Sequence, residues 1–207
     1  KRGVFSNEAG LGSSVMVHSA SNVKEPVTQG LWGIFEVFFD TIIVCTLTAL
    51  LILTTGIVDL ETGVSLSGST KLGLATEAFT NSFGTFGGIF IAIAVTLFAF
   101  STVLGWSYYG SKAWEYLFGT KSIMVYKVIF VIVVLAGSTL DAKLAIDLSD
   151  TFNGLMAIPN LIGVICLSGL VLKITKNYTE RKFKNADIAP MYSVFPEIQK
   201  AQEAAED

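Results

Sequence analysis

The sequence predicts an all-α integral membrane protein with four transmembrane helices. Hydrophobic residues make up 52% of the 207 residues and charged residues only 15%, against about 25% charged in typical soluble domains. Residues 78–111 contain no charge at all. A helix rises about 1.5 Å per residue, so about 20 apolar residues cross a hydrocarbon core of about 30 Å. This stretch is long enough to cross a membrane, and the chain is therefore expected to lie in a lipid bilayer.

Four apolar stretches predict the four spans. The first includes the uncharged residues 41–58. The third contains a single charge, Lys127, close enough to the end of the span for its ammonium group to reach the interface. The fourth contains Pro159, which suggests a bend in that helix. In chain order, the spans are expected at about residues 31–58, 87–106, 123–140 and 151–172.

The polar segments around the spans predict three regions. The long connection 59–86 contains the turn-rich residues 63–73 and is interpreted either as a binding loop or as a solvated excursion. Residues 141–150 predict a short amphipathic helix at the outer surface, and the polar residues after Asn185 predict a partly disordered tail. The regions are a cytoplasmic segment with a short helix (1–30), a transmembrane domain (31–178) and a cytoplasmic C-terminal tail (179–207).

Lysine and arginine residues predict the orientation. The N-terminal segment, the second connection and the tail are richer in them than the first and third connections. Cytoplasmic loops of membrane proteins carry an excess of these residues. Both ends of the chain are therefore expected on the cytoplasmic side of the cell (inner) membrane. Four spans independently require that both ends lie on the same side.

The residues that enzymes use are scarce. His18 is the only histidine, so a histidine-cluster metal site or a catalytic triad is not expected. Residues 119–122 lack the preceding glycine of a phosphate-binding loop. Cys45 and Cys166 both lie in apolar runs, where they are interpreted as small membrane-buried side chains. We therefore predict no catalytic residues, no cofactor and no nucleic-acid partner.

A hydroxyl pair and an aromatic residue in the second span form the stronger of two candidate sites. Thr102 and Trp106 are four residues apart and share a helix face, and Ser101 precedes Thr102. Hydroxyl oxygens can coordinate Na⁺ or accept a hydrogen bond from an ammonium group, and an indole can form the wall of a small pocket. Alternatively, the hydroxyls bond to carbonyls of their own helix and Trp106 belongs to an interfacial belt. Spacing alone leaves both interpretations open.

Two carboxylates at the start of the first span form the second candidate site. Glu36 and Asp40 are also four residues apart. Carboxylates at membrane depth are costly, which favours a functional role. Asp40 directly precedes the apolar run and is the better candidate for a gate or an ion-path contact, whereas Glu36 could equally lie at the interface.

Four blocks of the sequence resemble one transporter family. They are KRGVFSNEAGLGS (1–13), EPVTQGLWGIFEVFFDTIIVCTLTALLIL (25–53), FAFSTVLGWSYYG (98–110) and the basic exit KNY (176–178). Together they resemble the alanine or glycine:cation symporter family, the prokaryotic sodium:alanine symporters. Within the first block, Ser6 or Asn7 could cap a helix that starts near Glu8. The chain opens on Lys1 within this block, so we expect it to be the C-terminal portion of a longer protein.

The resemblance implies a LeuT-like fold of two inverted five-helix repeats with a site at the bilayer midplane. The four helices of this chain would form most of the second repeat, and the missing N-terminal half would complete the site. Thr102 and Trp106 would bind the substrate, and Ser101 and Thr102 the coupling Na⁺, the one metal ion expected. The implied function is sodium-coupled uptake of a small neutral amino acid, alanine or glycine. A proton-coupled carrier and a non-transporting membrane scaffold are the alternatives.

Overall fold

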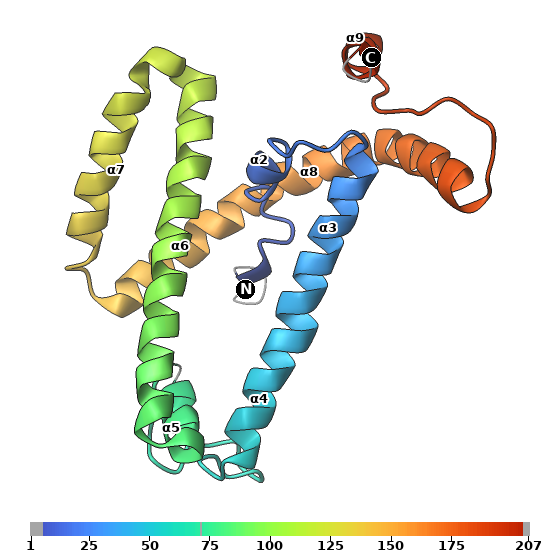
Figure 1. The fold of residues 1–207 in the computed structure, drawn as a ribbon. Helices are drawn as coiled ribbons and strands as arrows, with labels where there is room; N and C mark the ends of the chain where they lie inside the picture. Colours follow the sequence, from blue (N-terminus) through green and yellow to red (C-terminus); the bar gives the residue numbers. More distant parts are fainter. Residues whose placement is uncertain (1–5, 71, 205–207) are drawn as a thin grey trace. The chain divides into compact units, whose positions relative to one another are not determined.

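The computed structural model describes residues 6–70 and 72–204, and most of these residues are helical (Figure 1). The one β-type pairing in the described ranges is an isolated bridge between Val58 and Ser65. This confirms the all-α class for the described part of the chain. The helices are α2 (Val15–His18), α3 (Pro26–Phe38), the π-helix η1 (Phe39–Val44), α4 (Cys45–Thr54), α5 (Leu72–Phe83), α6 (Thr85–Phe118), the 3-10 helix η2 (Thr120–Ser122), α7 (Ile123–Gly137), α8 (Ala142–Phe183) and α9 (Pro196–Ala204).

Within the described residues, four helical stretches are long and apolar enough to cross a membrane, which is consistent with a multi-pass membrane protein. Each overlaps one of the predicted spans, although the ends differ. The stretches are Pro26–Thr54, Thr85–Phe118, Thr120–Gly137 and Ala142–Phe183. Glycines with positive φ explain two of the ends. Gly56 has a φ of 69° and follows the end of α4, and Gly119 has a φ of 78° and caps α6. Such backbone conformations suit glycine and end a helix.

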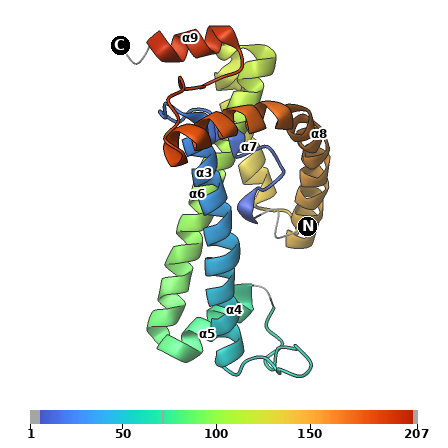
Figure 2. The same cartoon turned by 90° about the vertical axis from the view of Figure 1, so that its right-hand side faces the viewer.

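The amphipathic segment 141–150 is not a separate helix, which corrects that prediction. Residues 142–150 form the first turns of α8, a helix of 42 residues. The Asp141 carboxylate caps this helix by accepting hydrogen bonds from the backbone N–H groups of Lys143 (2.9 Å) and Leu144 (3.2 Å). No glycine or proline separates this segment from the fourth span, so the helix continues. The helix contains Pro159 and changes direction along its length (Figure 2).

The connection 59–86 is only partly a loop, because residues 72–83 of it form α5. This helix packs on the start of α6, where Ala78 is fully buried and the rings of Phe79 and Phe90 stack with centroids 5.7 Å apart. The preceding turn is organised by Asp59, whose carboxylate accepts hydrogen bonds from the N–H of Glu61 (2.9 Å) and the hydroxyl of Thr62 (2.8 Å). These hydrogen bonds lower the pKa of Asp59.

The contacts divide the chain into two compact units. One unit is Phe38–Ser138 and the other consists of Lys1–Val37 together with Thr139–Asp207. In the first unit, α7 packs beside the last turns of α6. Trp114 donates a hydrogen bond from Nε1 to Ser122 Oγ at 2.9 Å and its ring lies 5.7 Å from that of Tyr126.

In the second unit, the N-terminal segment lies against α8. Asn160 of α8 donates a hydrogen bond to the carbonyl of Gly10 at 3.0 Å.

The helix expected near Glu8 does not start there, because Glu8 has a φ of 52° and accepts a hydrogen bond from Ser13 Oγ at 2.7 Å. The next helix, α2, begins only at Val15.

Candidate functional site

The predicted hydroxyl pair lies at the middle of α6. Ser101 Oγ donates a hydrogen bond to the Phe98 carbonyl at 2.9 Å, and Thr102 Oγ1 donates to the same carbonyl at 2.8 Å. The alternative considered from the sequence, hydroxyls bonded to their own helix, therefore describes this structure. It does not remove a binding role, because a donating hydroxyl keeps two lone pairs that can accept a hydrogen bond or coordinate a cation. The two oxygens are held together by one shared acceptor.

Trp106 lies one turn further along the face of Thr102. Its ring contacts Tyr109 in an edge-to-face arrangement, with centroids 5.7 Å apart and planes at 75°. The spacing of Thr102, Trp106 and Tyr109 (i, i+4, i+7) places all three on one stripe of α6. Tyr109 is not among the candidate residues predicted from the sequence, although the helical spacing could have identified it.

Gly105 leaves space beside this stripe. It lies four residues after Ser101 and so on the same face of α6. A Cβ built at this position meets no atom within 4 Å in the part of the chain that the structure describes. The packing of these residues therefore does not require a glycine here. The open space is compatible with the approach of a ligand or another segment.

The two carboxylates of the second candidate site lie in different environments. Glu36 belongs to α3, and its Oε2 lies 3.3 Å from His18 Nε2. His18 Nδ1 lies 2.7 Å from the side-chain nitrogen of Gln29. An amide N–H can only donate, so Nδ1 accepts and the ring proton of a neutral His18 is on Nε2, facing Glu36. The histidine thus ties α2 to α3, a contact that the sequence analysis missed.

Asp40 belongs to the π-helix η1 rather than to a regular α-helix. Its backbone carbonyl accepts a hydrogen bond from the N–H of Cys45, five residues later. Short π-helical segments are rare and are often found at functional sites. The sequence contains four consecutive β-branched residues at 41–44, which are weak helix formers, but this signal does not specify a π-turn.

No group of three or more His, Cys, Asp or Glu side chains that could hold a metal ion occurs in residues 6–70 and 72–204. Cys45 and Cys166 are free thiols. A site for a monovalent cation can be made of hydroxyl and carbonyl oxygens and needs no His, Cys, Asp or Glu side chain. The hydroxyl pair of α6 therefore remains the better candidate among the described residues.

Comparison with known proteins identifies relatives over most of the chain. The model of the sodium:alanine symporter family matches residues 1–192. The sodium/alanine symporter AgcS of Methanococcus maripaludis is 44% identical over 180 residues, which are 87% of this chain and 39% of that protein. The amino-acid carrier protein AlsT of Bacillus subtilis is 34% identical over 188 residues, or 90% of this chain and 39% of AlsT.

A third relative is the sodium/proton-dependent alanine carrier protein of Bacillus sp., 31% identical over 199 residues, which cover 90% of this chain and 45% of that protein. The chain thus spans about two fifths of the length of the curated relatives that it matches. The family model covers nearly the whole chain and describes transporters rather than enzymes. The chain therefore belongs to the sodium:alanine symporter family.

Proposed function

We propose that this chain is part of a sodium-coupled symporter that carries a small neutral amino acid, alanine or glycine, into the cell. Family membership and the names of relatives such as the sodium/alanine symporter AgcS support this proposal. The observation that carries it is the arrangement at the middle of α6. There the hydroxyls of Ser101 and Thr102 share one carbonyl acceptor, and Trp106 lies one turn after Thr102. Polar groups in a membrane-spanning helix usually face the bundle interior or a cavity.

In the proposed site, Ser101 and Thr102 supply oxygen ligands to Na⁺. Their hydroxyl protons are directed at the Phe98 carbonyl, which leaves the oxygen lone pairs directed elsewhere. Thr102 and Trp106 bind the amino acid, with the indole limiting the size of the side chain. Asp40 and Glu36 are proposed as gate or ion-path residues.

The family resemblance supports a LeuT-like arrangement in which these helices form most of the second inverted repeat. The rest of the transporter would then complete both binding sites. Both ends of this chain would lie on the cytoplasmic side of the cell membrane. A ligand shifts a conformational equilibrium only through a difference in its affinity for the two states. Na⁺ would therefore favour the outward-open state and prepare the amino-acid site.

Uptake of labelled alanine tests the proposed function directly. The full-length transporter that contains this chain is reconstituted into proteoliposomes with an inward Na⁺ gradient, and with K⁺ as the control. We expect concentrative uptake only with Na⁺. Uptake driven by a proton gradient instead would support an amino-acid carrier with H⁺ rather than Na⁺ as its coupling ion. The name of the Bacillus sp. relative, a sodium/proton-dependent alanine carrier protein, makes this a specific alternative. No uptake in either case, from folded protein, would contradict the proposal.

Removing one hydroxyl oxygen tests the proposed cation site. We expect Thr102→Val to raise the Na⁺ concentration for half-maximal uptake at least about tenfold, which corresponds to about 1.4 kcal/mol. Thr96→Val is the matched control, because Thr96 Oγ1 makes the same hydrogen bond, to the Ala92 carbonyl at 2.8 Å. Thr96 is six residues from Thr102 and lies on another face of α6. Equal shifts in the two variants would remove Thr102 from the site.

A further inference from the structure

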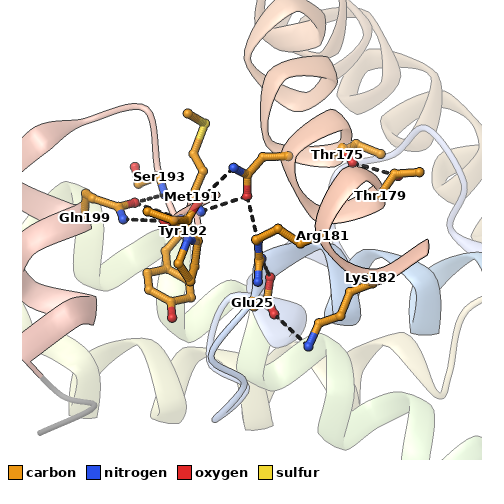
Figure 3. A network of polar contacts seen from close by, with 12 residues as sticks. Glu25, Thr175, Thr179, Arg181, Lys182, Met191, Tyr192, Ser193 and Gln199 are labelled. Carbon is orange, nitrogen blue, oxygen red and sulfur yellow. Dashed lines mark hydrogen bonds and ion pairs between the residues drawn. The ribbon is translucent and has the colours of Figure 1, made fainter. Parts of the chain in front are cut away.

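A nearly buried ion pair connects the start of α3 with the end of α8. Glu25 directly precedes α3, and its Oε2 is paired with Nη2 of Arg181 in the last turn of α8. The side chains are only 16% and 13% exposed. The other carboxylate oxygen of Glu25 lies 3.6 Å from Lys182 Nζ. Both oxygens of Glu25 therefore face cations from α8 (Figure 3).

Asn177, one turn before Arg181, joins this ion pair to the C-terminal segment 186–204. Its Oδ1 accepts hydrogen bonds from Arg181 Nε at 3.1 Å and from the Met191 N–H at 3.0 Å. Its Nδ2 donates to the Ala189 carbonyl at 2.9 Å. One amide group thus orients the guanidinium toward Glu25 and holds the backbone of the C-terminal segment on both sides of Pro190.

The side chain of Gln199 in α9 holds the C-terminal segment in a defined conformation through hydrogen bonds within the segment. Its Oε1 accepts hydrogen bonds from the N–H groups of Tyr192 (2.8 Å) and Ser193 (3.0 Å), and its Nε2 donates to the Pro190 carbonyl (2.9 Å). The segment predicted to be partly disordered is therefore folded at these residues. The sequence did not indicate this structure, because hydrogen bonds between one amide side chain and nearby backbone groups produce no periodic apolar pattern.

The folded C-terminal segment also lies over the start of α3. Tyr192 is only 6% exposed. Together with Ile198 it lines a cavity of about 470 Å³, whose other walls include Gln29 and Gly33 of α3 and His18 of α2. The C-terminal segment thus contacts α8 through Asn177 and contributes to a cavity shared with α2 and α3.

We propose that Asn177 and Arg181 are positioning residues: together with segment 186–204 they form a clamp that fixes the start of α3 against the end of α8. A transport cycle that moves α3 must loosen this clamp, so its strength affects the turnover rate. A buried charge that loses its partner is strongly destabilising, so the clamp is expected to form and open as a unit. The effect on turnover rests on the proposed transport function, whereas the clamp itself does not.

Proteolysis of the full-length protein in lipid nanodiscs tests whether the C-terminal segment is held. A glutamate-specific protease can cleave after Glu197 and Glu203, and the released C-terminal peptides are followed by mass spectrometry. We expect Arg181→Gln and Asn177→Ala to raise the cleavage rate at Glu197 about tenfold. Lys176→Gln is the matched control, since Lys176 lies in the same part of α8 with a side chain that is 76% exposed. Equal cleavage rates in all variants would contradict the clamp.

A double-mutant cycle separates a pairwise contact from general damage. Glu25→Gln alone is expected to raise the cleavage rate at Glu197, because it leaves the Arg181 guanidinium without its partner. The double variant Glu25→Gln with Arg181→Gln is expected to be cleaved within about threefold of the rate of Arg181→Gln alone. If Arg181→Gln does not fold, Asn177→Ala tests the clamp, because it removes the hydrogen bonds to Ala189 and Met191 and leaves the charges of Glu25 and Arg181 in place. Multiplication of the two single effects in the double variant would contradict the Glu25–Arg181 pairing.

Turnover provides the second measurement. We expect Arg181→Gln to change the maximal uptake rate per folded transporter at least about threefold, and the control Lys176→Gln to leave it unchanged. Release of the C-terminal segment without any change in turnover would overturn the positioning role. If the original protein does not transport alanine, the proposed function fails, while the proteolysis result still decides whether the clamp exists.

Discussion

Trp106→Ala is expected to raise the KM for alanine at least about tenfold while the transporter stays folded. Removing the indole takes away the proposed wall of the amino-acid pocket, and a tenfold loss corresponds to about 1.4 kcal/mol of binding. Within the chain, the ring of Trp106 contacts Tyr109 of its own helix, so a small change in stability is expected. Uptake kinetics in proteoliposomes, with the amount of folded protein measured by size-exclusion chromatography, give both quantities.

Trp114→Ala is the matched control for this substitution. Trp114 lies two turns later on α6 and packs against α7, with its Nε1 bonded to Ser122 and its ring 4.6 Å from that of Phe118. Its loss is expected to lower the melting temperature without changing the KM for alanine. A Trp106 variant with unchanged KM, or one that resembles the Trp114 variant in both measurements, would remove Trp106 from the proposed pocket.

Gly87→Ala is expected to have the largest effect on stability in the unit that contains α5 and α6. A Cβ at Gly87 would overlap the backbone carbonyl oxygen of Phe79 and lie 2.6 Å from its carbonyl carbon. Backbone atoms of a packed helix cannot move aside as a flexible side chain can, so the clash would push α5 away from α6. Overpacking of this kind costs about 1–3 kcal/mol and occasionally more. Thermal denaturation in detergent, followed by the loss of the monodisperse chromatographic peak, measures it.

The neighbouring glycine supplies the control. A Cβ at Gly88 would find its nearest neighbour, Thr80 Oγ1, at 3.5 Å, which is an ordinary van der Waals contact. Alanine is also a better helix former than glycine by about 1 kcal/mol. We therefore expect Gly88→Ala to leave the melting temperature unchanged or to raise it slightly. If both variants melt at the same temperature, α5 and α6 do not pack as closely as the structure shows.

Hydropathy was sufficient to locate the spans but not their ends. The positions of the four apolar helices follow from composition, because about 20 apolar residues have few alternatives to a membrane helix. Their ends depend on single backbone conformations, such as the positive φ of Gly56 and Gly119, and on the capping carboxylate of Asp141. A sliding count of apolar residues contains none of this information.

The polar segments were predicted less well, because their structure depends on contacts between residues distant in sequence. Asn177 binds a segment twelve and fourteen residues later, and Arg181 binds Glu25, 156 residues earlier. Helix α5 was missed because its twelve residues, Leu72–Phe83, mix apolar and polar side chains next to a glycine-rich turn. The binding roles of Ser101, Thr102 and Trp106 were inferred from a family resemblance, whereas helical spacing alone predicted that Thr102 and Trp106 share a face of the helix.

Because α6 is longer than the hydrocarbon core of a bilayer is thick, the position of its side chains depends on the thickness of the surrounding membrane. At about 1.5 Å per residue, the 34 residues of α6 extend about 51 Å, and its uncharged part, residues 85–111, extends about 40 Å, against a hydrocarbon thickness of about 30 Å. An oversized helix tilts, protrudes or thickens the bilayer around it, at a cost of a fraction of a kcal/mol per Å of mismatch. The depth of Ser101 and Trp106 therefore depends on acyl-chain length. Membranes of different thickness would present these side chains at different levels, without any change in sequence.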